Sequence, residues 1–290
     1  MAGSGSATAN PQECAALMSK FAEQKSKLIE LEVNVFMFSA ADKGCLDVAR
    51  QALEAGGSAI MRRRTGDTAL HHAATSGEIE VAKLLIEHGG DINERDLHGA
   101  TPLFLAAESN HPEMVKALLD LKADPAIPGR SDATPLTAAA FNGNAKIVDL
   151  LLSHGADGKT ADKTGKSAVL YASARGFTGV VERLLASGVD VNAVYANNLT
   201  ALMWAAGYAE DVPEEDGVKT VTLLLDRGAK LNEQDDRGQT ALMTAAELGH
   251  TGVAELLIKR GADKTATSKA GKTAADLAPN DAMKAVLAAK

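Results

Sequence analysis

"GDTALHHAATSGEIEVAKLLIEHGGDIN" occupies residues 66–93, and a close copy, "GATPLFLAAESNHPEMVKALLDLKADP", begins 33 residues after it at Gly99. A catalytic site is usually assembled once from scattered residues. A pattern that recurs at a fixed interval indicates one structural unit that is stacked several times. The interval between these two stretches therefore decides the fold.

The repeat extends over nearly the whole chain. Five of its six spacings are 33 residues and the remaining one is 40, counted at the Thr or Ser that opens each "TAL" or "TPL" motif: Thr68, Thr101, Thr134, Ser167, Thr200, Thr240 and Thr273. One period before Thr68, the pattern persists in Ala40, Ala41, Gly44 and Gly56. The sequence predicts seven repeats with the boundaries 33–65, 66–98, 99–131, 132–164, 165–197, 198–237 and 238–270.

Each repeat has the pattern of two short helices. The motif Thr can accept a hydrogen bond from a free N–H of the first helix, and Gly77 ends that helix. The second helix, "IEVAKLLIEHG", carries an apolar stripe that includes Leu85 and ends at Gly89. An extended "ADIN" or "VDVN" segment and a Gly-containing turn follow. We therefore predict an all-α fold in which strand is limited to the tips of these turns.

The Thr-Pro-Leu motif followed by Ala-Ala, the "HGAD" segment and the 33-residue period resemble the ankyrin repeat family over residues 33–290. The resemblance implies an α-solenoid in which β-turn fingers project from stacked helix pairs. It also implies a concave groove, lined by the fingers and the first helices, that binds partners, mostly proteins. His71 occupies the usual histidine position of the family, where the ring hydrogen-bonds the finger backbone.

Several repeats depart from the pattern. Lys122 replaces the glycine that ends a second helix, and Asp132 and Asn198 replace finger glycines. Asp and Asn tolerate left-handed backbone, so we expect both turns to persist. The repeat 198–237 contains seven extra residues, and its acidic stretch 209–217 predicts a solvated loop between the two helices.

The two ends of the array differ from its middle, as is typical of caps. We expect residues 1–10 to be a disordered or processed start and residues 271–290 to be a short capping repeat. Residues 11–32 predict an amphipathic capping helix whose apolar residues cover the first repeat: Ala16, Leu17, Phe21, Leu28 and Leu31.

Composition limits the classes of partner. The formal net charge is −8, from 30 basic and 38 acidic residues, which argues against nucleic acid and against an anionic membrane surface. No apolar run approaches the 18 residues of a membrane span. We expect no membrane partner and a monomer when the protein is free.

The sequence motifs that would indicate a phosphate-binding, zinc-binding or catalytic site are incomplete. Three Gly-Lys-Ser/Thr triplets, at residues 158–160, 165–167 and 271–273, lack the earlier glycine that a phosphate-binding loop needs. His71 and His72 have no cysteine nearby to complete a zinc site, and no Gly-x-Ser-x-Gly motif is present. We predict no catalytic residues, no cofactor and no metal, although an active site within the groove remains an open alternative.

Two groups of side chains are candidates for partner contact. A basic row on the fingers indicates an acidic patch on the partner, although a solvated face would look the same: Arg62, Arg63, Arg64, Arg130, Lys163, Lys166 and Arg237. Aromatic residues fall within or just after first helices: Phe104, Phe141, Tyr171, Trp204 and Tyr208. From these groups and their finger neighbours, we predict the contact residues Arg64, Asp67, Phe141, Lys166, Tyr208 and Arg237.

The sequence favours a non-catalytic protein–protein interaction module that sequesters, inhibits or stabilises a partner. The first alternative is a scaffold or stabilising subunit that is permanently incorporated into a larger complex. The second is a small-ligand receptor or an enzyme. Size exclusion of native extract separates the first two functions, since a permanent subunit is never free.

Cys14 and Cys45 allow two interpretations. If the leading helix folds back near Glu32, its two arms are similar enough in length for the sulfurs to form a disulfide. One continuous helix through Ala41 would keep them apart as reduced thiols, which are the norm in the cytoplasm. A disulfide, together with the small-residue motif Ala7-Thr8-Ala9, favours an exported protein of the bacterial periplasm over a cytoplasmic one.

Overall fold

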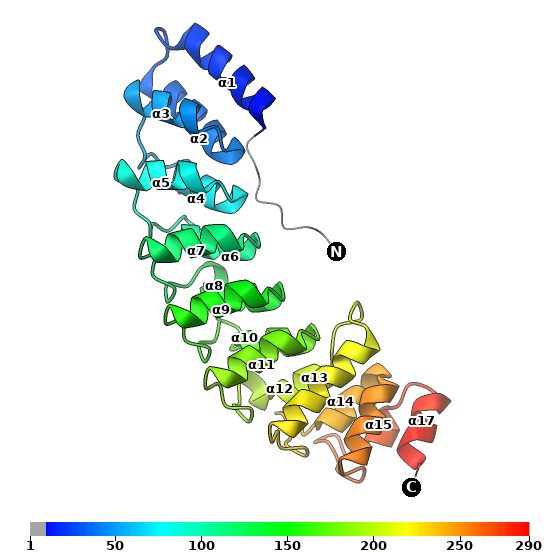
Figure 1. The fold of residues 1–290 in the computed structure, drawn as a ribbon. Helices are drawn as coiled ribbons and strands as arrows, with labels where there is room; N and C mark the ends of the chain where they lie inside the picture. Colours follow the sequence, from blue (N-terminus) through cyan, green and yellow to red (C-terminus); the bar gives the residue numbers. More distant parts are fainter. Residues whose placement is uncertain (1–9, 290) are drawn as a thin grey trace. The chain divides into compact units, whose positions relative to one another are not determined.

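The computed structural model of the protein describes residues 10–289. The chain divides into two compact units: the first holds the residues up to Asn142 together with Asp149–Ala156, and the second holds Gly143–Val148 and the residues from Asp157 on. Within each unit, short helices follow one another in pairs in the order of the chain (Figure 1). The expected disordered or processed start, with its Ala7-Thr8-Ala9 motif, lies outside the described residues.

The described part of the chain is helical throughout. Its helices up to residue 142 are α1 (Pro11–Gln24), α2 (Glu30–Lys43), α3 (Leu46–Glu54), α4 (Ala69–Ser76), α5 (Ile79–Glu87), α6 (Pro102–Glu108), α7 (Pro112–Asp120), the 3-10 turn η1 (Arg130–Asp132) and α8 (Pro135–Phe141). The later ones are α9 (Ala145–Ser153), α10 (Ala168–Ala174), α11 (Thr178–Ala186), the 3-10 turn η2 (Ala196–Asn198), α12 (Ala201–Ala206), α13 (Glu214–Asp226), α14 (Ala241–Leu248), α15 (Thr251–Lys259), α16 (Ala274–Leu277) and α17 (Asp281–Ala288).

Strand structure within residues 10–289 is limited to one isolated bridge, between Ala161 and Ser167 in a finger. The prediction of an all-α fold is therefore confirmed. None of the described helices has the length and apolar character needed to cross a membrane.

The motif threonines begin the first helix of each pair, as predicted. Thr101 lies directly before α6 in extended backbone, and its hydroxyl accepts the Phe104 N–H at 3.2 Å. Thr240 does the same for the Met243 N–H, also at 3.2 Å. Such a cap satisfies one N–H that has no partner inside the helix. The fixed spacing of these residues therefore sets where each pair begins.

Left-handed residues end the helices and shape the fingers. Gly89 follows α5 with φ +90°, and Lys122 adopts φ +72° in the corresponding place after α7. Asp132 and Asn198 have φ +60° and +57° in their fingers. Both turns therefore persist without glycine, as expected, because Asp and Asn carry a smaller left-handed penalty than other side chains.

The acidic stretch 209–217 is not the single loop that the sequence predicts. Helix α13 begins at Glu214, so Glu214, Glu215 and Asp216 form its first turn. Negative side chains are favourable there because they oppose the positive end of the helix dipole. The prediction of a loop through residue 217 is therefore wrong, and the insertion lengthens the second helix of this repeat.

Helix pairs stack on their neighbours within each unit. In the first unit, α4 packs on α2 and α6, and α5 packs on α3 and α7. In the second unit, α12 packs on α10 and α14, and α13 packs on α11 and α15. Apolar side chains between the pairs are fully buried, among them Leu70, Leu85, Leu103 and Leu170. Burial between neighbouring repeats is therefore the main source of stability in each unit.

Helix α1 covers the open end of the first repeat. It contacts α2 and α3, and the buried Phe21 ring meets the Phe36 ring edge-on with centroids 5.1 Å apart. The cap does not extend as one helix to residue 32: α1 ends at Gln24, and α2 begins at Glu30 after a turn. Leu31 belongs to α2 and is 62% exposed, so its expected place in the cap is wrong.

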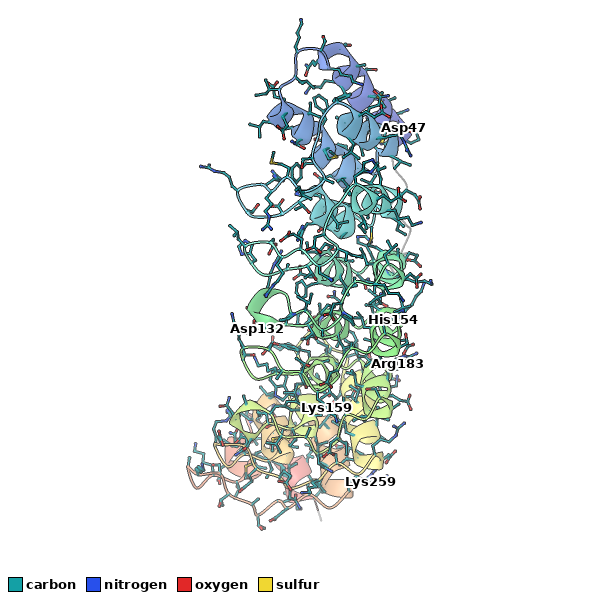
Figure 2. All side chains as sticks on the ribbon, turned by 90° about the vertical axis from the view of Figure 1, so that its left-hand side faces the viewer. Asp47, Asp132, His154, Lys159, Arg183 and Lys259 are labelled. Carbon is teal, nitrogen blue, oxygen red and sulfur yellow. A yellow bond between two sulfur atoms is a disulfide. The ribbon has the colours of Figure 1, made fainter. Side chains whose placement is uncertain are left out.

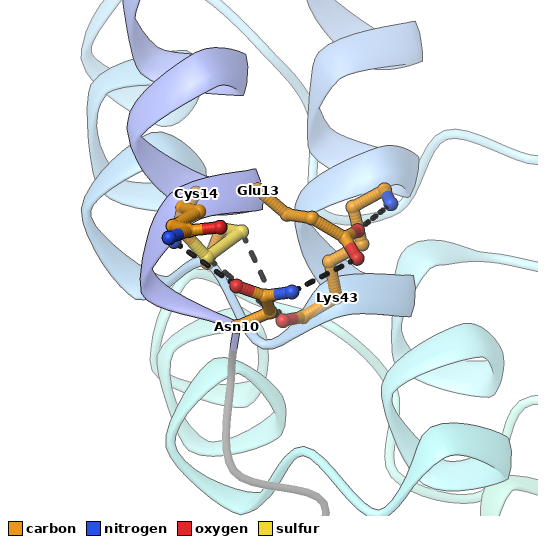
Figure 3. Close-up of a disulfide and its surroundings, with 6 residues drawn as sticks. Asn10, Glu13, Cys14 and Lys43 are labelled. Carbon is orange, nitrogen blue, oxygen red and sulfur yellow. Dashed lines mark hydrogen bonds and ion pairs between the residues drawn. A yellow bond between two sulfur atoms is a disulfide. The ribbon is translucent and has the colours of Figure 1, made fainter.

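A disulfide joins Cys14 on α1 to Cys45, which precedes α3, in agreement with the expected pairing (Figure 3). The two Cα atoms lie 5.2 Å apart across a sequence separation of 31 residues. Glu13 and Lys43 form an ion pair beside the bridge. The chain reverses between α1 and α2, slightly earlier than the bend expected near Glu32, and this reversal brings the two cysteines together.

Candidate functional site

Fingers and second helices lie on different sides of each unit. In the first unit, Figure 2 shows Asp132, in a finger, on the side opposite Asp47 of α3 and His154. In the second unit, Arg183 of α11 and Lys259 of α15 lie on the same side as each other, both on second helices. The predicted contact residues belong to fingers and first helices, so second-helix residues provide natural controls.

The first finger carries three arginines in different environments. Arg62 pairs with Glu94 of the next finger at 2.7 Å. Arg63 lies over the Phe38 ring at 5.4 Å and is 3.9 Å from the Asp67 carboxylate. Arg64 is exposed and forms no ion pair with any other described residue. Of the three, Arg64 is the most available for a partner carboxylate.

The Asp67 side chain is engaged in hydrogen bonds with residues of its own unit. Its carboxylate accepts hydrogen bonds from the Thr65 hydroxyl and from His72 Nε2, the latter at 2.6 Å. Partial burial raises the pKa of Asp67, but these hydrogen bonds outweigh it and hold the pKa below its usual value. Only 14% of the side chain is exposed. Asp67 therefore shapes the finger base and has little surface left for a partner.

A hollow of about 390 Å³ lies between α2 and the first finger. We call it the N-terminal groove, and it is lined by Leu31, Asn34, Val35, Phe38, Ser39, Asp42, Arg62, Arg63 and Arg64. The sequence prediction missed its apolar wall. The spacing of Leu31, Val35 and Phe38, at i, i+4 and i+7, was the available signal, since it places all three on one face of a helix.

His71 is a structural residue. Its side chain is buried, and its Nε2–H donates to the carbonyls of Glu94 and Ala100 at 3.1 and 3.2 Å. Nδ1 accepts the Thr68 N–H at 3.1 Å, so the neutral ring ties a helix start to the next finger. Burial lowers the pKa of His71 below its ordinary value. Across residues 10–289, no group of three His, Cys, Asp or Glu side chains is arranged to hold a metal ion.

Phe104 and Phe141 occupy first helices but differ in exposure. Phe104 is 3% exposed and packs beneath Gly129, whose backbone leaves no room for a side chain. Phe141, the last residue of α8, is 49% exposed. The aromatic signal in the sequence therefore divides into a core residue and a surface residue.

Lys166 in the second unit sits above two aromatic rings. Its Nζ lies 5.3 Å from the Trp204 ring centre and 6.0 Å from that of Tyr171. The Tyr171 hydroxyl donates to Asp162 at 2.6 Å, which fixes the ring. A cation held over aromatic faces is positioned more firmly than a free lysine. The geometry therefore brings together residues that the sequence placed in two separate groups.

Tyr208 and Arg237, also in the second unit, differ in exposure: Tyr208 is buried, and Arg237 lies at the surface. Tyr208 is 7% exposed, stacks on His250 at 3.7 Å and closely abuts Gly217. Its expected role as an exposed groove contact does not match this burial, which results from the insertion folding over it. Arg237 is 66% exposed and pairs with the buried Asp235 at 2.9 Å. Its guanidinium therefore remains at the finger surface.

Comparisons with known proteins agree with this geometry. A family model described as ankyrin repeats (3 copies) matches residues 36–129, 128–195, 175–268 and 212–286. The human ASB11 ankyrin repeat domain is 30% identical with a TM-score of 0.69, covering 76% of this chain and 96% of that one. The ankyrin repeat domain of Bcl-3 is 25% identical with a TM-score of 0.64, covering 78% of this chain and 100% of that one.

Curated relatives match over shorter stretches. The mouse Ankyrin repeat domain-containing protein 63 is 39% identical over 74 residues, 26% of this chain and 18% of that protein. The human NAD-capped RNA hydrolase NUDT12 is 37% identical over 65 residues, 22% of this chain and 14% of that protein. The chain thus spans less than a fifth of either relative, so the hydrolase activity in the name of NUDT12 is said of that protein alone. Family model and solved structures together cover most of the repeats: the chain belongs to the ankyrin repeat family.

Proposed function

We propose that this chain is a non-catalytic module that binds a partner protein through its fingers and first helices. Ankyrin repeat domains generally bind other proteins, and their matches cover most of this chain. The observation that carries the proposal is the exposure of Arg64, Phe141 and Arg237 on those elements. Arginine and aromatic residues contribute a large share of the energy at protein interfaces.

The proposed contacts are of two kinds. Arg64, Phe141, Lys166 and Arg237 retain surface that can meet a partner. Asp67 and Tyr208 belong to the proposal as supporting residues, because the first hydrogen-bonds His72 and the second stacks on His250. Replacing a supporting residue would change the shape of the surface more than its chemistry.

Packed helix pairs favour a preorganised binding surface in each unit. Side chains such as Lys166 are already held by their neighbours, so binding requires less ordering and the entropic cost of association falls. The exposed arginines favour an acidic patch on the partner. Sequestration, inhibition and stabilisation of that partner all fit such a surface, and so does permanent incorporation into a larger complex.

Capture from native extract tests the proposal. Tagged full-length protein is incubated with extract of its source, and bound proteins are identified by mass spectrometry. We expect a partner that is retained by wild type and lost with Arg64→Ala, Phe141→Ala, Lys166→Ala and Arg237→Ala combined. The matched control combines Lys83→Ala, Lys116→Ala and Glu255→Ala on the second helices α5, α7 and α15.

Two results would count against the proposed surface. One is the absence of any partner that wild type retains above a tag-only control. The other is a partner lost with the second-helix control but kept by the four-residue variant. Size exclusion of the same extract separates a reversible partner from a permanent one, since a permanent subunit elutes only in the complex.

A further inference from the structure

The N-terminal groove has an apolar wall that no described element covers. Val35 is 59% exposed and Leu31 is 62% exposed on α2, and Ile29, just before that helix, is also 62% exposed. Leu31, Val35 and Phe38 lie at i, i+4 and i+7, so they form one stripe along the helix. Scattered exposed apolar residues need no explanation, whereas a grouped stripe beside a hollow is typical of an interaction site.

The opposite wall is positively charged. Arg62, Arg63 and Arg64 all line the same hollow. The first two already have carboxylate neighbours, Glu94 at 2.7 Å and Asp67 at 3.9 Å, whereas Arg64 forms no ion pair with any described residue. Three adjacent arginines stand out against the net charge of −8 for the whole chain. This wall therefore attracts anionic groups locally.

Two carboxylates near the groove, Asp42 and Glu32, form hydrogen bonds away from the arginine wall. Asp42, the only carboxylate in its lining, lies 2.6 Å from His72 Nδ1. Glu32 accepts the Ile29 N–H at 3.1 Å at the start of α2. Neither carboxylate is paired with Arg64. Within the arginine wall, Arg64 is therefore the residue that has no carboxylate partner among the described residues.

We propose that the N-terminal groove binds an acidic segment of a partner protein that carries an apolar side chain among its carboxylates. The apolar side chain packs on Leu31, Val35 and Phe38, while the carboxylates meet Arg62, Arg63 and Arg64. Arginine suits this role because its planar guanidinium can form two parallel hydrogen bonds with one carboxylate. The inference rests on the proposed function and names the chemistry of the partner at this part of the surface.

A peptide selection tests this chemistry directly. Full-length protein selects binders from a phage library of random peptides of about twelve residues, long enough to span a groove of this kind. We expect the selected peptides to be enriched in Asp and Glu around one large apolar residue. Affinity of a selected synthetic peptide, followed by fluorescence anisotropy, should fall as NaCl concentration rises.

Variants assign the binding to the groove. Arg62→Ser, Arg63→Ser and Arg64→Ser combined should weaken the selected peptide about tenfold or more, the expected loss of several charge-assisted contacts. Val35→Asp, an exposed substitution, should weaken it comparably. The matched control, Lys83→Ser, Lys116→Ser and Lys259→Ser combined, removes the same charge from α5, α7 and α15 and should leave affinity within about twofold of wild type.

Several outcomes would overturn the inference. They are a selection without acidic enrichment, a peptide that binds the arginine variant as well as wild type, and no binding peptide at all. Binding of phosphatidylglycerol vesicles through the same arginines, with no peptide selected, would assign the groove to a membrane surface instead. A captured partner that depends on Phe141, Lys166 and Arg237 but not on Arg62–Arg64 would leave the proposed function standing while this inference fails.

Discussion

His71 illustrates how one side chain links two consecutive repeats. Its ring accepts the Thr68 N–H at the start of α4 and donates to Glu94 and Ala100 in the following finger. Only a neutral imidazole can accept on one nitrogen and donate from the other. Burial favours the same neutral form and lowers the pKa of His71.

Stability should therefore decrease as the pH falls. The folded-state pKa of His71 lies below its ordinary value of 6.5, so the unfolded state binds more protons in this range. The contribution of His71 is fully present above about pH 6.5 and is lost progressively below it. Urea unfolding at pH 8 and pH 5 should give a smaller free energy of unfolding at pH 5 for wild type.

His71→Gln isolates this effect, because glutamine retains hydrogen-bonding capacity without titrating. We expect a lower stability at pH 8 and a shallower decline toward pH 5. Burial raises the pKa of Glu78, which acts in the opposite direction and is common to both proteins. The control is His98→Gln at an exposed position, which shows how the loss of a surface histidine changes the free energy of unfolding at each pH. A decline as steep in His71→Gln as in wild type would contradict the assignment.

Leu85 tests whether burial between repeats stabilises the fold. Its side chain is fully buried on α5. Leu85→Ala should reduce the free energy of unfolding by about 2–5 kcal/mol, because it removes apolar contacts and leaves a cavity. Leu97→Ala, at a leucine that is 74% exposed, is the matched control and should change stability by less than about 0.5 kcal/mol. Equal losses in urea unfolding would show that Leu85 is not part of the core.

At the scale of elements, the repeat pattern correctly predicted the residue at which each first helix begins from α4 onward. Each motif residue immediately precedes a first helix. The hydroxyl accepts an N–H of the first turn at five of these positions, Thr101, Thr134, Thr200, Thr240 and Thr273, whereas Ser167 forms no such cap. The insertion was harder to predict, since its acidic residues suit both a solvated loop and a helical first turn. The structure shows the helical first turn, since α13 begins at Glu214. The Glu214 carboxylate also accepts a hydrogen bond from the Gly252 N–H at 2.7 Å.

The disulfide should matter most for the N-terminal cap. It closes a loop with a sequence separation of 31 residues and ties α1 to the start of α3. Cys14→Ser with Cys45→Ser should lower the free energy of unfolding by about 3–4 kcal/mol in the chain-entropy model. The measurement is urea unfolding of wild type and variant, together with wild type in a reducing agent.

Thiol titration of the denatured, unreduced protein checks the bridge itself. We expect no free thiol in protein isolated under oxidising conditions. Two free thiols would contradict the disulfide and remove the argument for export to an oxidising compartment. The periplasmic location remains a prediction that rests on this bridge.

At the scale of the molecule, periodicity predicted the fold and the finger positions, but not what covers each side chain. Tyr208 is buried because His250, from the next repeat, stacks on it and Gly217, from the insertion, lies against its ring. Leu31 is exposed because α1 ends early and α2 begins before it. A fixed period specifies which element a residue belongs to. It does not specify contacts that depend on an insertion or on a turn at the end of the array.

We propose that fingers and first helices, not second helices, bind the partner. The most direct test is the dissociation constant for the captured partner, measured by isothermal titration calorimetry. We expect the combination of Arg64→Ala, Phe141→Ala, Lys166→Ala and Arg237→Ala to raise this dissociation constant about a hundredfold, because several interface anchors are lost, with little change in melting temperature. Lys83→Ala, Lys116→Ala and Glu255→Ala combined should leave it within about threefold. A larger loss of affinity in this second-helix variant than in the first would contradict the claim.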